Sequence, residues 1–566
     1  MYTASSAFLE ALAEAGVSHV FVNWGSDHPA LIEAIAEARA TEAAVPRVIT
    51  CPNEMAALSA AHGFYQATGV AQAVIVHVEC GTQSLGGAVH NAAKGRIPVL
   101  IFAGASPFTQ EGELPGSRNE FIQWIQDVHD QRGLVRGYMR YDYELKTGRN
   151  IRQIVHRALQ FANSDPKGPV YLMGAREVME EEIPRAVVNP AQYRTVEPGA
   201  LPRSGVAAIG AALSAAERPL VVTSYLGRSE VAFEGLTAFC RKHGVGVLES
   251  VPSYVNFPHT DELYQGNQWN QPVQNEALAS ADLVLVIDSD VPWIPAVSRP
   301  AAMASIFQID ADPLKEQMPL FHLAARQVFR ADAATALEQF ADFPAEAERV
   351  AARRAHWAGL HAARRARLEA LEERGNGEIT PEYLVSRVRE LAGEDASYLN
   401  EGISNYHTVF NHLRLADAGR MFASGGGSLG WNGGAAFGVK LARPEKTVIT
   451  LTGDGSYMFS APSSVHWMAR QYEAPFVQII FNNRGWKSPK LSALAVHPAG
   501  FASRAEGLDV AFDPPPDYAG IAVAAGGALG VTVKDPAEVD AAILAALRAV
   551  REEGRSAVLD VWVAKL

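Results

Sequence analysis

The sequence is poor in cysteine and contains no long apolar run. Its three cysteines, Cys51, Cys80 and Cys240, are too few and too widely spaced for a disulfide framework or a zinc site. No apolar run reaches the roughly 18 residues that a membrane helix needs. The N-terminus also lacks the basic start and the apolar core of a secretory signal. We therefore expect a soluble, cytoplasmic protein with no membrane partner.

Basic residues are also in short supply. The 49 Lys and Arg residues are outnumbered by 62 Asp and Glu residues, and the net charge is −13. This balance argues against nucleic acid as a partner, because binding a phosphate backbone needs clustered Lys and Arg. Apolar residues make up 48% of the 566 residues, which is enough for an ordinary core in each of about three or four domains.

Short apolar runs alternate with helical patterns along most of the chain. In residues 1–180 the strand candidates are His19–Asn23, Arg47–Thr50, Ala73–Val78, Val99–Ala103 and Val170–Met173. In residues 200–345 they are Pro219–Thr223, Val245–Glu249, Asp282–Ile287 and Ser305–Ile309. A third unit occupies residues 375–566. The alternation predicts an α/β fold with three consecutive α/β domains, each built on a parallel sheet covered by helices.

Polar residues follow two buried-strand patterns in the third unit. The apolar run Thr447–Thr452 leads into Gly453-Asp454-Gly455, and the run Phe476–Phe481 leads into Asn482-Asn483. Mg²⁺ prefers oxygen ligands and takes one or two protein carboxylates when phosphates supply the rest. The glycines let backbone N–H groups approach phosphate oxygens closely. Gly-Asp-Gly alone is ordinary turn chemistry, but the two strand ends together predict a site for Mg²⁺ and a diphosphate.

The expected metal ligands are the Asp454 carboxylate, the Asn483 side-chain oxygen and the backbone carbonyl of Gly485. This pattern identifies the chain as a member of the thiamine diphosphate enzymes. Nearly the whole chain resembles the acetolactate synthase, pyruvate oxidase and benzoylformate decarboxylase group. The resemblance implies thiamine diphosphate and Mg²⁺ as cofactors. It also implies that the three consecutive domains are a pyrimidine-binding, a central and a diphosphate-binding domain.

Glu54 follows the Arg47–Thr50 strand and opens a helical pattern. The resemblance implies that its carboxyl group shares a proton with N1′ of the cofactor's pyrimidine ring, which makes the 4′-imino nitrogen a base. A Glu in a dry pocket suits that task, because desolvation favours the protonated form. The alternative is a carboxylate that interacts with a helix N-terminus. The resemblance also implies that Glu54 of one subunit faces the Gly453–Gly455 motif of another, so we expect at least a homodimer, and a homotetramer as the full assembly.

A glycine-rich segment, Ser424–Trp431, precedes the Thr447–Thr452 strand. Similar segments in the family hold the cofactor bent. By position, the Gly427 carbonyl accepts from the 4′-amino group, and Leu429 lies beneath the angle between the two rings. A flexible turn explains a glycine-rich stretch equally well when it is taken alone. The resemblance places further cofactor contacts at Gly453, Gly455, Ser456, Gly485 and Trp486.

Two residues of the N-terminal domain match the benzoylformate decarboxylase group at the substrate. His77 falls on that group's active-site histidine, and Ser26 matches its substrate-binding serine. A His near the cofactor can move protons, because its ordinary pKa lies near neutrality. His28 is a second catalytic candidate. For both histidines the alternative is a structural residue, hydrogen-bonded in the core or placed in a loop.

The remaining substrate candidates depart from that group. Its second active-site histidine is not evident, and its neighbourhood here contains Trp293. After the paired asparagines, Trp486 and Lys487 are expected to line the substrate end, with Lys487 available for an anionic substrate. The alternative for Lys487 is a lysine of a surface loop. These departures concern the identity of the substrate and leave the cofactor assignment unchanged.

The resemblance implies a 2-oxo acid decarboxylase or an acetolactate synthase-like carboligase. In that chemistry the cofactor ylide attacks a carbonyl, CO₂ leaves, and the enamine is protonated to an aldehyde or adds to a second carbonyl. The alternatives are a 2-hydroxyacyl lyase and a catalytically silent regulatory homologue, although intact Glu54, Asp454 and Asn483 argue against the second. Several relatives carry FAD in the central domain. Because Ser224–Arg228 and Asp288–Ile294 form no clear flavin site, we predict no FAD.

Overall fold

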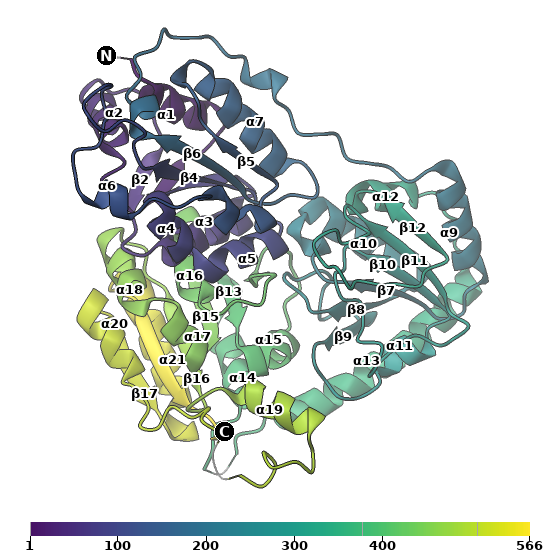
Figure 1. Cartoon of the computed structure of the whole chain (residues 1–566). Coiled ribbons are helices and arrows are strands. Elements are labelled where there is room, and N and C mark those ends of the chain that lie inside the picture. The colour runs from purple at the N-terminus through teal and green to yellow at the C-terminus, as the bar shows by residue number, and fades with distance from the viewer. Residues whose placement is uncertain (1, 376, 506–507, 566) are drawn as a thin grey trace.

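The computed structural model describes residues 2–375, 377–505 and 508–565. Within these residues the chain forms three six-stranded sheets in three consecutive α/β units (Figure 1). All paired strands in the three sheets are parallel. The predicted fold class is therefore confirmed, and each sheet lies within one of the three predicted residue ranges.

The N-terminal sheet has the order β2-β1-β3-β4-β6-β5. Its strands are β1 (His19–Val22), β2 (Arg47–Thr50), β3 (Gln72–Val76), β4 (Val99–Ala105), β5 (Tyr141–Glu144) and β6 (Val170–Ala175). Its helices are α1 (Ala4–Glu14), α2 (Pro29–Ala40), α3 (Glu54–Thr68), α4 (Val78–Ser84), α5 (Gly86–Lys94), α6 (Ile122–Ile125), α7 (Ile151–Asn163) and α8 (Arg176–Met179). Strands β3 and β4 are buried along their whole length, as expected of central strands covered on both faces.

The central sheet has the order β12-β11-β10-β7-β8-β9, the order of a doubly wound dinucleotide-binding fold. Its strands are β7 (Pro219–Thr223), β8 (Gly246–Ser250), β9 (Tyr264–Gln268), β10 (Leu283–Ile287), β11 (Ser305–Asp310) and β12 (Gln327–Arg330). Its helices are α9 (Arg203–Ala215), α10 (Glu230–His243), α11 (Glu276–Ser280) and α12 (Ala333–Gln339). The long helix α13 (Ala347–Leu371) leads from this unit to the next.

The C-terminal sheet has the order β14-β13-β15-β16-β18-β17. Its strands are β13 (Ala396–Glu401), β14 (Met421–Phe422), β15 (Thr447–Gly453), β16 (Val477–Asn482), β17 (Leu529–Val533) and β18 (Ala557–Trp562). Its helices are α14 (Pro381–Ala392), α15 (Tyr406–Leu413), α16 (Trp431–Ala442), α17 (Asp454–Phe459), α18 (Pro462–Gln471), α19 (Lys487–Val496), α20 (Tyr518–Gly526) and α21 (Val539–Arg551). The two runs predicted to precede the metal ligands are β15 and β16, which pair directly.

Helices α3 and α16 join the N-terminal and C-terminal units (Figure 1). They meet through small residues: a Cβ on Gly63 would lie 2.2 Å from the Ala435 carbonyl oxygen, and one on Gly438 would lie 2.0 Å from that of Ala60. The backbones therefore approach more closely than side chains would allow. In the described part of the chain, no helix combines the length and the apolar character needed to cross a bilayer.

Candidate active site

A cavity of about 390 Å³ lies at the carboxyl ends of β13, β15 and β16. The predicted cofactor and metal residues of the C-terminal domain all line it: Gly427, Leu429, Gly453, Asp454, Gly455, Ser456, Asn483, Gly485 and Trp486. The predicted substrate residue Lys487 lines it as well. Carboxyl ends of parallel strands are the usual place for a ligand in an open α/β sheet.

Asp454 is the first residue of α17 and is 2% exposed. Its Oδ1 accepts from the N–H of Gly455 at 2.8 Å, and its Oδ2 accepts from the N–H of Gly485 at 3.0 Å. The Asn483 side-chain oxygen accepts from the same Gly485 N–H at 3.1 Å. The ends of β15 and β16 thus bring the carboxylate and the amide oxygen to one point.

The charge of Asp454 has no cationic partner among the described residues. Burial raises the pKa of its carboxyl group to about 6, and the hydrogen bonds from backbone N–H groups only partly oppose this effect. In the described chain, no group of three or more His, Cys, Asp or Glu side chains could hold a metal. A cation here would instead be held by one carboxylate, an amide oxygen, a backbone carbonyl and ligand oxygens, as Mg²⁺ often is.

Other atoms at this cavity also fit a diphosphate with Mg²⁺. The hydroxyl oxygen of Ser456 is buried and has no hydrogen-bond partner, which is unusual for a buried polar atom. The Gly485 carbonyl accepts from the N–H of Lys487 at 3.1 Å, and its second lone pair remains for a metal. A Cβ on Gly455 would lie 2.9 Å from the Trp486 ring, so only glycine fits between Asp454 and that ring.

The two asparagines of the motif have different partners. The Asn482 side chain donates to Asp560 at 2.7 Å and is fully buried, whereas Asn483 faces the cavity. The structure therefore leaves the Asn483 side chain at the cavity, and its role as a ligand stays a prediction.

The glycine-rich segment is held by α5 of the N-terminal unit. The N–H of Gly427 donates to Nε2 of His90 at 3.0 Å. The Asn91 side chain makes two hydrogen bonds to the backbone of Ser428, at 2.9 and 3.1 Å. A Cβ on Gly426 would lie 2.4 Å from the Asn91 Oδ1 atom, so this close contact requires glycine. Segments more than 300 residues apart thus fix the loop predicted to bend the cofactor.

Glu401, the last residue of β13, lines the same cavity and binds the start of α16. One carboxylate oxygen accepts from the N–H of Gly430 at 2.8 Å, and the other accepts from the N–H of Asn432 at 2.9 Å. Burial raises the pKa of Glu401 to about 7, against the effect of these hydrogen bonds. Glu401 was not among the residues predicted from the sequence. Its only local signal is an acid at the end of an apolar strand.

The predicted catalytic residues of the N-terminal unit lie at the carboxyl ends of β1, β2 and β3. Glu54 is the first residue of α3, which Asn53 caps by accepting from the N–H of Ala56 at 2.9 Å. His77 follows β3 directly, and its Nδ1 contacts a carboxylate oxygen of Asp27. The Ser26 hydroxyl is buried without a partner. His28 is 1% exposed and packs edge-on against Trp24.

The two sets of predicted residues are not brought together within one chain. The described residues that line the 390 Å³ cavity come from positions 400–489 and from Trp269, and none belongs to residues 1–180. Glu54 and His77 therefore lie outside this cavity. The predicted position of Glu54 beside the diphosphate site needs a second copy of the chain, and it stays a prediction.

Trp293 lies in a neighbouring cavity of about 410 Å³. Trp269 lines both cavities, and its ring stacks on that of Tyr406 at 4.0 Å. The structure thus places Trp269 and Tyr406, which the sequence analysis did not identify, at the cavity that contains Lys487. Their aromatic character carried no positional signal, because stacked aromatic pairs are common in any core.

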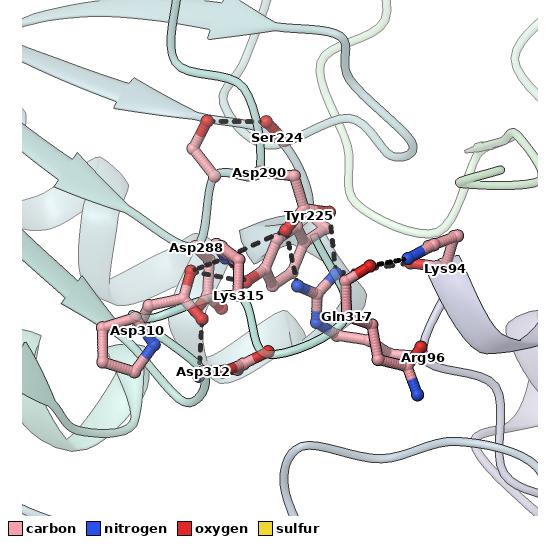
Figure 2. A network of polar contacts seen from close by, with 12 residues as sticks. Lys94, Arg96, Ser224, Tyr225, Asp288, Asp290, Asp310, Asp312, Lys315 and Gln317 are labelled. Atoms are coloured by element: carbon pink, nitrogen blue, oxygen red, sulfur yellow. Dashed lines mark hydrogen bonds and ion pairs between the residues drawn. The ribbon is translucent and has the colours of Figure 1, made fainter. Parts of the chain in front are cut away.

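The crevice of the central domain, where a flavin would be expected, contains side chains of the chain itself (Figure 2). After β7 and β10, the N–H groups of Ser224 and Tyr225 donate to the Asp288 carbonyl at 3.0 and 3.1 Å. The Tyr225 hydroxyl donates to Asp310 at 2.6 Å. The Arg96 guanidinium lies 4.0 Å from the centre of the Tyr225 ring.

Charged groups complete this network. Arg96 makes two hydrogen bonds to Asp290, at 2.5 and 2.9 Å. Lys315 lies 2.5 Å from Asp310 and 2.9 Å from Asp290. A cavity of about 90 Å³ borders Arg96, Asp290 and Lys315, and the absence of FAD stays a prediction.

Three family models match this chain. They are described as the N-terminal TPP binding domain, the central domain and the C-terminal TPP binding domain of thiamine pyrophosphate enzymes, and they match residues 2–134, 206–341 and 402–561.

Individual relatives are between 19% and 27% identical to the chain in sequence. A benzoylformate decarboxylase of Pseudomonas aeruginosa is 27% identical over 85% of this chain and 86% of its own length. An acetolactate synthase large subunit of Lactococcus lactis is 23% identical over 81% and 76%. The crystal structure of a benzoylformate decarboxylase from Polynucleobacter necessarius covers 100% of both chains at 19% identity with a TM-score of 0.81, which shows the shared fold.

Proposed function

The chain belongs to the thiamine pyrophosphate enzyme family, and we propose that it is a thiamine diphosphate- and Mg²⁺-dependent 2-oxo acid decarboxylase or carboligase. The observation that carries this proposal is the buried Asp454 carboxylate, which meets Asn483 at the Gly485 N–H and has no cationic partner in the described chain. The reaction class is supported by the relatives named benzoylformate decarboxylase and acetolactate synthase.

Each predicted residue has a task that its surroundings suit. Asp454, Asn483 and the Gly485 carbonyl would hold Mg²⁺, and the unpartnered Ser456 hydroxyl would donate to the diphosphate. When bound, thiamine diphosphate supplies a nucleophilic carbon and accepts the electrons released by decarboxylation. Lys487, half-buried at the start of α19, would bind the carboxylate of the 2-oxo acid.

The walls of the cavity would exclude water from the reacting carbon. Trp269, Tyr406 and Trp486 supply large apolar surfaces around the open volume. Ile403, also at the cavity, has a φ of 46°, which is rare for a β-branched residue and typical of functional sites. Whether a proton or a second carbonyl compound is added after CO₂ leaves depends on which of them reaches this space.

The proposal includes a shared site in a homodimer. Glu54 would reach the cavity of the partner chain and hold a proton toward the pyrimidine ring. His77 and Ser26, at the same end of the N-terminal sheet, would then face the substrate. The absence of residues 1–180 from the described lining of the cavity supports this arrangement. A homotetramer would consist of two such dimers.

Calorimetry followed by a substrate panel tests the proposal. Thiamine diphosphate is titrated into the purified protein with Mg²⁺ and with EDTA, and we expect binding only with the metal. The holoenzyme is then incubated with aliphatic and aromatic 2-oxo acids, with and without an aldehyde acceptor, while CO₂ and products are followed. Release of CO₂ from at least one acid is expected.

The other outcomes separate the alternatives. Absence of cofactor binding would favour a silent regulatory homologue. Binding without CO₂ release, but with cleavage of a 2-hydroxyacyl substrate, would favour a lyase.

A further inference from the structure

Asp27 is a buried carboxylate between β1 and α2, beside the candidate catalytic histidine. Its Oδ1 contacts Nδ1 of His77, and its Oδ2 accepts from the N–H of Val78 at 3.1 Å. The same Oδ2 lies 3.3 Å from Nε2 of His28. The Asp27 side chain is 1% exposed, whereas that of His77 is 22% exposed. The carboxylate therefore holds one edge of the His77 ring in the interior while part of the ring stays accessible.

Two glycines, Gly25 and Gly104, leave the space that the Asp27 and His77 side chains occupy. A Cβ on Gly104 would lie 1.6 Å from Asp27 Oδ2, and a Cβ on Gly25 would lie 1.9 Å from His77 Nδ1. Val78 has a φ of 25°, which a β-branched residue rarely adopts, and its N–H is bonded to Asp27. Strained backbone of this kind persists where surrounding contacts hold it, often at functional sites.

The charges around the pair favour an ionised Asp27 and a protonated His77. The hydrogen bond to Asp27 raises the pKa of His77 above its usual value, although burial opposes this, and the Gln126 side chain and the Glu54 carboxylate add to the increase. Burial alone would raise the pKa of Asp27, but His28, His77 and the Val78 N–H together lower it. His28 faces the pair from the same loop, and burial lowers its pKa although the Asp27 carboxylate opposes this effect.

From this geometry we propose that Asp27 is a positioning residue that holds His77 with Nδ1–H toward the carboxylate, so that His77 donates a proton from Nε2 to the substrate oxygen. The Nε2–H bond breaks, an O–H bond forms, and the N–H electron pair stays on Nε2. The neutral imidazole regains a proton from water. The inference rests on the proposed function, since it assumes that His77 faces the substrate, and it deepens that function by naming the residue that sets the histidine's tautomer and charge.

Asp27→Asn in the holoenzyme tests the inference, because it keeps the shape of the side chain and removes its charge. We expect kcat to fall by about 10²-fold, within the range for general acid catalysis, with KM and cofactor affinity changed by less than about threefold. Protonated His77 is the active form, so activity falls as pH rises through its pKa. Losing an adjacent opposite charge should move that fall to lower pH by about one unit or more.

Glu372→Gln is the matched control, since Glu372 pairs with the buried His412 at 2.7 Å in the C-terminal unit. It removes a carboxylate from another histidine and should leave the pH profile unchanged. The double variant Asp27→Asn/His77→Gln should be as active as His77→Gln alone, because Asp27 acts through His77. An unshifted pH profile in Asp27→Asn, or additive losses in the double variant, would overturn the inference.

A measurement on the wild-type protein covers the case in which Asp27→Asn fails to fold. NMR of ¹⁵N-histidine-labelled holoenzyme, with the His77 signal assigned from His77→Gln, should show a protonated Nδ1 throughout and a pKa above the ordinary value near 6.5. A His77 signal with free Nδ1 would overturn the inference even if the enzyme is active. Absence of turnover with this signal intact would instead count against the proposed function.

Discussion

The central and C-terminal domains place carboxylates at the same end of similar parallel sheets, but they neutralise them differently. In the central domain, Asp290 is paired with Arg96 and Lys315, which outweigh burial and hold its pKa well below the usual value. In the C-terminal domain, Asp454 is more deeply buried than Asp290, has no cationic partner among the described residues, and has its pKa raised to about 6 by burial. The carboxylate of the central crevice, called here the closed crevice, has cationic partners within the chain. The cavity at Asp454, called here the open crevice, lacks a positive charge that a bound metal would supply.

The largest effect expected from this comparison is on cofactor binding. Asp454→Asn removes the charge that would hold Mg²⁺, so we expect thiamine diphosphate affinity in the presence of Mg²⁺ to fall by about 100-fold or more, a loss of about 2.7 kcal/mol. Calorimetry measures it. Asp395→Asn, which removes an exposed carboxylate near Lys446, is the control and should bind normally. Normal binding by Asp454→Asn would mean that the open crevice is not the metal site.

Mixing two inactive variants tests whether Glu54 of one chain and Asp454 of another form one active site. Glu54→Gln and Asp454→Asn should each lose turnover while remaining folded. After dissociation and random reassociation, half of the dimers are hybrids with one intact site, so about a quarter of wild-type activity should return. If both residues serve a site within one chain, the mixture will stay inactive.

Removing the carboxylate of the closed crevice should lower the stability of the protein, whereas removing the carboxylate of the open crevice should lower its affinity for the cofactor. Asp290→Asn leaves the Arg96 guanidinium buried without its charge partner, which typically costs about 3–5 kcal/mol. Thermal and denaturant unfolding of the protein without cofactor should show this loss. The same experiment on Asp454→Asn should show a smaller loss, because the variant gives up one of the two hydrogen bonds from the Gly455 and Gly485 N–H groups but also removes a buried charge that has no cationic partner. Equal losses in both would contradict the comparison.

A smaller effect is expected at Ser456. Its hydroxyl has no partner in the protein, so Ser456→Ala should change the stability of the cofactor-free protein by less than about 0.5 kcal/mol. If the hydroxyl donates to the diphosphate, affinity should fall by about tenfold, the effect of one hydrogen bond to a charged group. Calorimetry and unfolding on the same samples separate the two. Unchanged affinity would remove Ser456 from the binding site.

The last prediction concerns FAD, which we expect the central crevice not to bind. Protein purified without added cofactors should lack the flavin absorption band at about 450 nm. Asp290→Asn, which opens the network, serves as the comparison after incubation with FAD. A flavin band in the wild-type protein would show that the Asp290 network does not close the crevice.

The sequence predicted the strands at the centre of each sheet better than those at the edges. Buried strands such as β4 and β10 are continuous apolar runs, and they were identified. The edge strands β5 and β12 were not, because both are short and rich in polar residues, β5 is half-buried and β12 is largely exposed. Their pairing depends on a neighbouring strand rather than on their own hydrophobicity.

The candidate site divides in the same way. Asp454 and Asn483 were predictable because each directly follows an apolar strand within one domain. Asn91 was not, since its contact with Ser428 joins positions 337 residues apart. Asp27 lay beside predicted residues, but its role depends on a contact with His77 that local sequence does not show.

Strand periodicity and turn chemistry are local properties of the chain, so the α/β class, the order of the three domains and the strand ends that carry Asp454 and Asn483 could be predicted from the amino-acid sequence alone. Folding in three dimensions was needed to bring Asp27 to His77, α5 to the glycine-rich loop, and Arg96 to Asp290 in the central crevice. These contacts join residues distant in sequence, and their energies arise from burial and charge pairing that exist only once the chain has folded.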